Sequence, residues 1–192
     1  MNTPAKTSPP RYSNREFPSY RFIPGQAPHP TRDPDGHSYN HPLEKPEAFE
    51  AGNWQSCDGY LYGIDLFNHG YWWEAHEAFE PVWVAVGKQT ETGQFVQGLI
   101  QVAVANLKNI QGATDVARRM AKSGLDKMRR REGIYLGIDV PRFCREVTSF
   151  FEAGDQPAVI IDLVMADKEP TSVPGQPACS NIMARLKALI SR

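Results

Sequence analysis

The sequence predicts an all-α protein, a compact bundle of about four to six helices with a proline-rich extended N-terminal arm. Apolar residues recur every three or four positions from Trp54 onward, which is the helical period. Glycines separate these amphipathic stretches and mark their ends. Strand-like content is too low for a sheet, so short connections between packed helices are the expected architecture.

We divide the chain into an arm, residues 1–53, and a helical bundle domain, residues 54–192. Ten of the sixteen prolines lie in the arm. Each proline fixes its own φ and removes a backbone donor, so regular helix or sheet is not expected there. We expect the first fifteen residues to be disordered. Residues 20–39 carry aromatics at both ends and two histidines, which a simple linker does not need.

Five helices are expected in order along the domain. They run from Trp54 to about Phe67, and over about 71–86, 94–110, 114–131 and 140–151. The third is apolar around most of its circumference, which indicates a central position. Asp139 fits the N-cap of the fifth, and Pro141 fits its first turn. Residues 157–164 could form one short strand or an extended segment against the bundle, and residues 180–190 could form a last amphipathic helix.

Composition excludes several classes of function. The 192 residues carry a formal charge of −1, so nothing draws the chain toward nucleic acid or an anionic membrane. The basic residues of 122–132 suit the outer face of a helix. No stretch approaches the roughly 20 apolar residues of a membrane span, and no signal peptide is recognised. The three cysteines are far apart, which fits a reducing, cytoplasmic location. No serine-hydrolase or nucleotide-binding motif is present.

The candidate site lies in residues 71–83, YWWEAHEAFEPVW. At about 100° per residue, His76 and Glu80 lie about 40° apart on a helix, in the middle of a stripe that includes Trp72 and Trp83. We expect this stripe to face the interior. A buried carboxylate is costly unless it is paired, so Glu80 is expected to have a partner.

Three neighbours complete the expected geometry of this helix. Glu77 lies at the edge of the stripe, and Glu74 is expected to point nearly opposite to it. Pro81 lies inside the helix, where it removes one backbone hydrogen bond, so a kink is expected beside the polar residues.

Two interpretations of the cluster follow. In the first, His76 and Glu80 bind a divalent metal ion such as zinc, iron or manganese, and Glu77 acts as general base or orients the ligands. The protein would then be a metal binder or a metal-dependent hydrolase. In the second, the cluster is a structural polar network in a non-enzymatic bundle that binds a small ligand or a protein. The residues specify neither a reaction nor a substrate.

Partners for the cluster can be named on the third helix. Gln97 and Gln101 share a face that Lys108 continues. If this face meets the second helix, the glutamines could donate hydrogen bonds to Glu77 or Glu80. The alternative is that the face is solvated, as polar helix faces usually are.

The arm offers a second source of ligands. His29, His37 and His41 could fold over the bundle and close the site, or they could be ordinary loop histidines. The surplus of aromatic side chains in the first two helices could instead form a homodimer interface or a groove for a partner.

Two motifs carry a resemblance to a known family. LFNHGYWWEAHEAFEPVW and FVQGLIQVAVANL resemble the bacterial and archaeal family called domain of unknown function 309. The matching positions are Phe67, Asn68, Gly70, Trp72, His76, Glu77, Glu80, Trp83, Gln97, Gly98, Leu99, Ile100 and Gln101. The resemblance covers about residues 58–150 and implies a small all-α bundle, but no activity. The chain departs from the family at Lys108, where many members carry histidine, and in the arm, which the shortest members lack.

Overall fold

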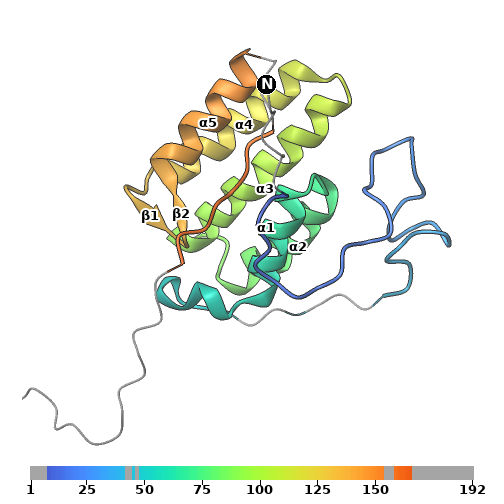
Figure 1. Ribbon diagram of the computed structural model, residues 1–192, viewed down its shortest axis with the longest axis horizontal. Coiled ribbons are helices and arrows are strands. Elements are labelled where there is room, and N and C mark those ends of the chain that lie inside the picture. The colour runs from blue at the N-terminus through green and yellow to red at the C-terminus, as the bar shows by residue number, and fades with distance from the viewer. Residues whose placement is uncertain (1–7, 42–44, 46–47, 154–157, 166–192) are drawn as a thin grey trace, which may run out of the picture.

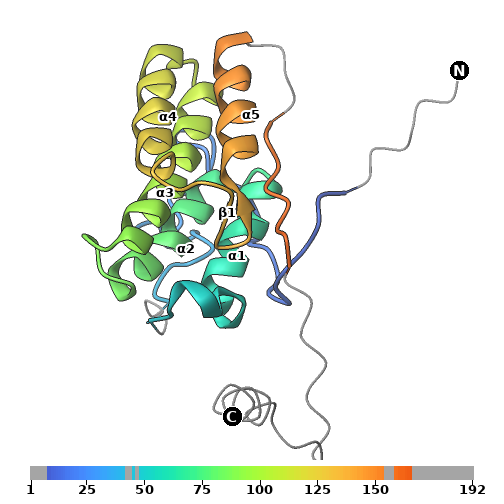
Figure 2. The same ribbon diagram turned by 90° about the vertical axis from the view of Figure 1, so that its left-hand side faces the viewer.

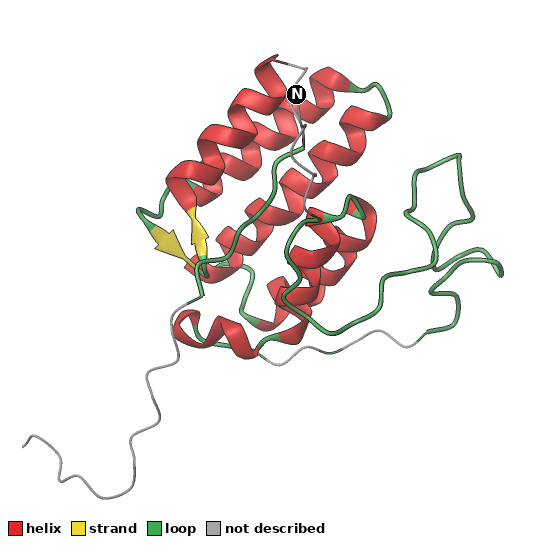
Figure 3. Cartoon of the chain, in the orientation of Figure 1, coloured by secondary structure: helices red, strands yellow, loops and turns green. Residues whose placement is uncertain are grey.

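A computed structural model describes residues 8–41, 45, 48–153 and 158–165. Within these ranges the chain forms six helices and one short β-ribbon (Figure 3). The helices are the 3-10 helix η1 (Ala51–Ser56), α1 (Asp58–Asn68), α2 (Trp72–Ala85), α3 (Glu91–Ile110), α4 (Thr114–Met128) and α5 (Val140–Ala153). The strands are β1 (Ile134–Tyr135) and β2 (Ile138–Asp139). The predicted all-α class is therefore confirmed.

Helix α3 is central, as its apolar circumference predicted. It packs against α2 on one side and against α4 on the other, and α5 packs on α4 (Figures 1 and 2). The contact between α3 and α4 is close because two glycines face each other. A Cβ atom added to Gly98 would lie 2.8 Å from the carbonyl oxygen of Gly124, which is closer than packing allows. No helix in the described ranges is long and apolar enough to span a membrane.

The helix ends follow from capping. Helix α3 begins at Glu91, earlier than expected, because the Thr90 side chain accepts a hydrogen bond from the backbone N–H of Gly93. The expected cap of α5 is confirmed, since Asp139 Oδ1 accepts from the N–H of Arg142 at 3.0 Å. Helix α4 ends at Met128, short of the expected Arg131. Helix α2 continues through Pro81 as one helix.

The β-ribbon between α4 and α5 was not predicted. Its two-residue strands are too short to show alternation, and they pair through a turn at Leu136 and Gly137. Both turn residues have positive φ, +47° and +77°, as the tight hairpin turns require. The hydroxyl of the fully buried Tyr60 donates to the Leu136 carbonyl at 2.8 Å, which fixes the ribbon to α1.

Of the two alternatives for residues 157–164, the described part is an extended segment against the bundle. Ile161 and Leu163 are buried. The side-chain amide of Asn68 holds the segment, because it donates to the Ile161 carbonyl at 2.8 Å and accepts from the Ile161 N–H at 2.7 Å. The helix expected over residues 180–190 lies outside the described residues.

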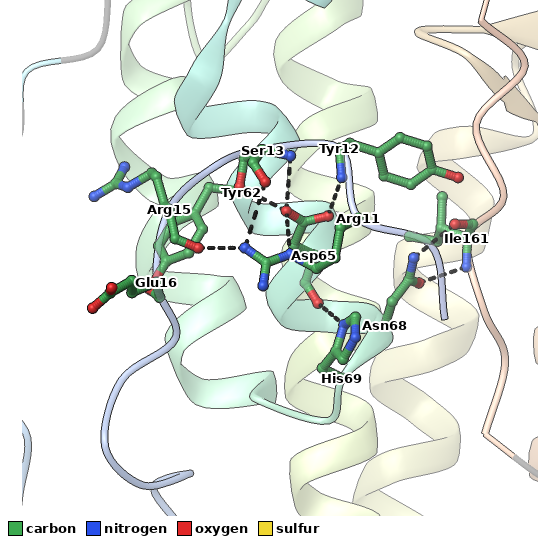
Figure 4. A network of polar contacts seen from close by, with 10 residues as sticks. All are labelled: Arg11, Tyr12, Ser13, Arg15, Glu16, Tyr62, Asp65, Asn68, His69 and Ile161. Carbon is green, nitrogen blue, oxygen red and sulfur yellow. Dashed lines mark hydrogen bonds and ion pairs between the residues drawn. The ribbon is translucent and has the colours of Figure 1, made fainter. Parts of the chain in front are cut away.

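The arm is fastened to α1 by a buried carboxylate (Figure 4). Asp65 has no solvent exposure. It accepts hydrogen bonds from Arg11 Nε, from the backbone N–H groups of Tyr12 and Ser13, and from Ser13 Oγ, over 2.6 to 3.0 Å. We expected disorder through residue 15, but a carboxylate that is fully buried needs donors, and residues 11–13 supply them.

Candidate metal centre and adjoining cavity

The core face of α2 differs from the expected one. Ala75, Phe79 and Val82 are fully buried, whereas the side chain of Glu80 is 52% exposed. The expectation that Glu80 is buried is therefore wrong. Tryptophan side chains are large and are seldom fully buried, so they lie along the border of the core and do not mark its centre. Trp72, which we placed in the stripe, is half-buried against the core.

Three polar side chains nevertheless converge on the outer side of α2. The ring nitrogen Nε2 of His76 lies 3.4 Å from Glu77 Oε1 and 3.7 Å from Glu80 Oε1. One ligand atom from each residue lies within 4.8 Å of the other two. We call these three residues the α2 cluster. It is the predicted site, and it is half-buried rather than buried.

The orientation of the imidazole is fixed by the backbone. His76 Nδ1 lies 2.8 Å from the carbonyl oxygen of Trp73, and a carbonyl can only accept, so Nδ1 carries the proton. In the neutral imidazole Nε2 then presents its lone pair toward the two carboxylates. Histidines that bind metals usually donate their other N–H in this way. The Trp73 ring also packs edge-on against the imidazole, with centroids 4.9 Å apart.

The electrostatics of the cluster leave negative charge uncompensated. Burial raises the pKa of the Glu77 carboxyl above its usual value, His76 lowers it in part, and the nearby Glu80 carboxylate raises it again. No described protein group donates a hydrogen bond to either carboxylate. A divalent cation would therefore find one imidazole nitrogen and two carboxylates without competing protein donors.

Two arm histidines reach α2, but neither joins the cluster. The His29 ring packs against Trp73, with centroids 5.4 Å apart. His37 Nε2 lies 3.1 Å from Glu74 Oε1, and both side chains are buried. The group of possible ligands around His76 contains Glu77 and Glu80 and no arm residue.

Glu74 is the residue that sequence reasoning missed. We expected it to point nearly opposite to the stripe and gave it no role in the site, but it is buried, with only 5% exposure. The arm covers it, and the N–H of Phe22 donates to its Oε1 at 2.7 Å. A helical projection shows only neighbours within one helix. It gives no information about contacts with the arm, which lies about fifty residues earlier in the chain. The histidines of the arm were the only available signal.

The possible partners on α3 do not contact the cluster. Among the described residues no hydrogen bond joins Gln97 or Gln101 to the cluster. Gln101 lies toward α4, since its Cβ is 3.1 Å from the position of a Cβ built on Gly124. Its Oε1 is buried without a hydrogen-bond partner. Lys108 donates to Gln111 at 3.2 Å.

Two further predicted site residues have packing roles. Asn68 holds Ile161, as described above, and lies on a different helix from the cluster. Trp83 carries the Lys88 ammonium over its ring at 4.6 Å, near the end of α2. Neither contacts the three ligand atoms.

A cavity of about 540 Å³ lies between the arm and helices α1 and α2. Among its lining residues are Phe17, Tyr62, Trp73, Glu74, Glu77 and His37. Glu77 belongs to both the cavity wall and the α2 cluster, whereas His76 and Glu80 belong only to the cluster. A group bound in the cavity would therefore lie next to the cluster through Glu77.

The fold and site together define an all-α bundle whose second helix carries an H-E-x-x-E cluster. Residues 60–120 match the family model Domain of unknown function (DUF309). The resemblance predicted from the two motifs is thereby confirmed for this part of the chain. The match includes all three residues of the α2 cluster. No curated protein matches the chain.

Proposed function

We propose that His76, Glu77 and Glu80 bind one divalent metal ion, and that the protein is a metal-dependent hydrolase. The observation that carries the proposal is the convergence of one imidazole nitrogen and two carboxylates within 4.8 Å. Ligand bonds of about 2.1 Å in a tetrahedral site hold neighbouring ligand atoms about 3.4 Å apart. The distances of 3.4 Å and 3.7 Å from His76 Nε2 need little change to reach that geometry.

The donor set suits zinc, iron or manganese, because imidazole and carboxylate are their common ligands. Three protein ligands leave a position for water, and such an ion lowers the pKa of bound water toward neutrality. A ligand role uses only one oxygen of Glu77, which also lines the cavity, so its second carboxylate oxygen is left to accept a proton from the bound water.

The alternative is a structural polar network in a non-enzymatic bundle. One observation favours metal over this alternative. A structural network should be buried and satisfied, but the Glu77 and Glu80 side chains are 40% and 52% exposed and accept no hydrogen bond from described protein groups. Their convergence on one imidazole does little for stability, since exposed ion pairs contribute little.

Elemental analysis by mass spectrometry tests the proposal. The protein is purified without chelator or histidine tag, and stoichiometric zinc, iron or manganese is expected. The variant His76→Ala should lose the metal while it remains folded. Absence of metal from the wild-type protein, even after incubation with each ion, would contradict the proposal.

A matched control is His69→Ala. His69 also has Nδ1 against a backbone carbonyl, that of Asp65 at 2.9 Å, but it lies outside the α2 cluster. This variant should keep the metal. Equal loss of metal in both variants would indicate non-specific binding to histidine. If metal is present, screening of ester and phosphoester substrates then separates a hydrolase from a metal binder.

A further inference from the structure

The cavity under the arm has walls that suit a small molecule. Its volume of about 540 Å³ lies within the usual range of ligand sites. Phe17, Tyr62, Leu66 and Trp73 supply apolar and aromatic surface. Such surfaces bind the body of a ligand, while a few polar groups set its orientation.

The charges on these walls are predominantly negative. Three carboxylates line the cavity, those of Glu16, Glu74 and Glu77, against the one guanidinium of Arg15. Arg15 is already engaged, because it lies over the Tyr62 ring at 4.2 Å and 3.7 Å from Asp58. With the histidines counted as neutral, the cavity has an excess of acidic groups.

Two neighbouring residues of the wall have polar atoms that lack partners. Glu74 uses Oε1 to accept from Phe22 and to meet His37, but its Oε2 is buried and has no hydrogen-bond partner. The indole Nε1 of Trp73 is also buried and unpartnered. An unsatisfied buried acceptor costs about 1–3 kcal/mol, so such groups mark places where a ligand or water completes the hydrogen bonding.

We infer that this cavity binds a small organic cation, an amine with an apolar body and an acceptor oxygen. Glu74 Oε2 and Trp73 Nε1 have almost no accessible surface, so binding requires both side chains to turn toward the cavity. The ammonium then donates to Glu74 Oε2, the oxygen accepts from Trp73 Nε1, and the apolar body packs on the aromatic wall. This inference does not depend on the metal, because the proposed polar contacts are with Glu74 and Trp73, which are not ligands of the proposed metal site.

Calorimetric titration with a matched series of probes tests the inference. The probes are 2-amino-3-phenylpropan-1-ol, its neutral isostere 3-phenylpropane-1,2-diol, and phenethylamine, which lacks the hydroxyl. Buffer containing EDTA removes any contribution of the α2 cluster. The amino alcohol should bind saturably, at least about tenfold more tightly than the diol, because hydrogen bonds to charged groups are the stronger ones. Equal affinity for amine and diol, or no saturable binding of the amino alcohol, would overturn the inference.

Three variants assign the contacts. Glu74→Gln keeps the size of the side chain and an acceptor for Phe22, and should abolish the preference for amine over diol. Trp73→Phe keeps a ring but removes the N–H, and should remove the preference for the amino alcohol over phenethylamine. Glu80→Gln should lose metal but keep amine binding, so failure of the metal proposal and failure of this inference are distinguishable. Because the probe series works on the wild-type protein, the inference stays testable even if a wall variant does not fold.

Discussion

The molecule contains two carboxylate sites on adjacent helices that differ in how completely they are satisfied. Asp65 on α1 is fully buried and accepts four hydrogen bonds from residues 11–13 of the arm. Glu77 and Glu80 on α2 are half-exposed, and His76 lies between them, 3.4 Å and 3.7 Å from their Oε1 atoms. The first carboxylate has used its acceptor capacity within the protein, whereas the other two have not.

This difference supports a structural role for Asp65 and the metal-binding role that we propose for the α2 cluster. A buried carboxylate with all its donors in place fixes the chain that supplies those donors. Carboxylates that face one another around a single imidazole repel each other and leave room for a cation. The arm connects the two sites, since it is fastened at Asp65 and then covers α2 beside the cluster, where its residues contact Glu74 and Trp73.

The largest effect is expected from removal of the Asp65 carboxylate, which accepts four hydrogen bonds from the arm. Asp65→Ala should lower the free energy of unfolding by about 3 kcal/mol, because buried donors of the arm lose their acceptor or the arm detaches. Urea denaturation measures the loss, and limited proteolysis near Arg15 should become faster. Asp126→Ala is the control, because Asp126 is exposed and its ion pair with Lys122 should contribute nothing measurable. Equal stability of the two variants would remove the contrast between the sites.

The next largest effect concerns the α2 cluster. Addition of a divalent ion at 100 times its Kd should stabilise the wild-type protein by about 2.7 kcal/mol, because the ion binds only the folded state. Thermal denaturation with and without manganese or zinc measures the shift. Glu80→Gln should lose the shift and Asp65→Asn should keep it. Stabilisation of the same size in Glu80→Gln would locate the ion elsewhere.

A smaller effect is expected at the clamp between α1 and the extended segment. Asn68→Ala should destabilise by about 1–3 kcal/mol, since it leaves the N–H and carbonyl of Ile161 without partners. The measurement is again urea denaturation. Metal content should not change, because Asn68 is remote from the ligand atoms. Loss of metal together with stability would show that the two regions are not independent.

The smallest effect is pH-dependent and concerns Glu77. Its pKa is raised in the folded state, so folding disfavours the ionised carboxylate. The protein therefore loses stability as pH rises through the folded-state pKa of Glu77. Glu77→Gln removes this loss, so the metal-free variant should be more stable than wild type at pH 8, by less than about 1 kcal/mol because the group is half-exposed. The gain should vanish near pH 4. Thermal denaturation of both proteins across this range measures it, and a gain that grows toward acid pH would contradict the assignment.

Local patterns were sufficient to predict most of the bundle. Apolar spacing gave the five α-helices, and the Asp139 cap was found where it was expected. The family resemblance followed from two motifs within the matched region. The pairing of His76 with Glu80 was also accessible, because residues four positions apart lie on the same face of a helix. The contact between His76 and Glu77 does not follow from such spacing.

Features that depend on distant parts of the chain were not predictable. The orientation of α2 was misjudged because its tryptophans border the core, and Ala75 lies at the centre of the buried face. The buried state of Glu74 and the anchor at Asp65 both depend on an arm more than fifty residues away. No spacing within one helix reveals such a contact, and a proline-rich segment gives no periodicity from which to place it.

Anomalous diffraction from crystals soaked in zinc tests the central claim most directly, with data collected above the zinc absorption edge. The account predicts one strong anomalous peak about 2.1 Å from His76 Nε2, with Glu77 and Glu80 turned toward it and no peak at Asp65. Absence of a peak at His76, with both carboxylates turned to solvent, would contradict the claim that the α2 cluster is a metal centre.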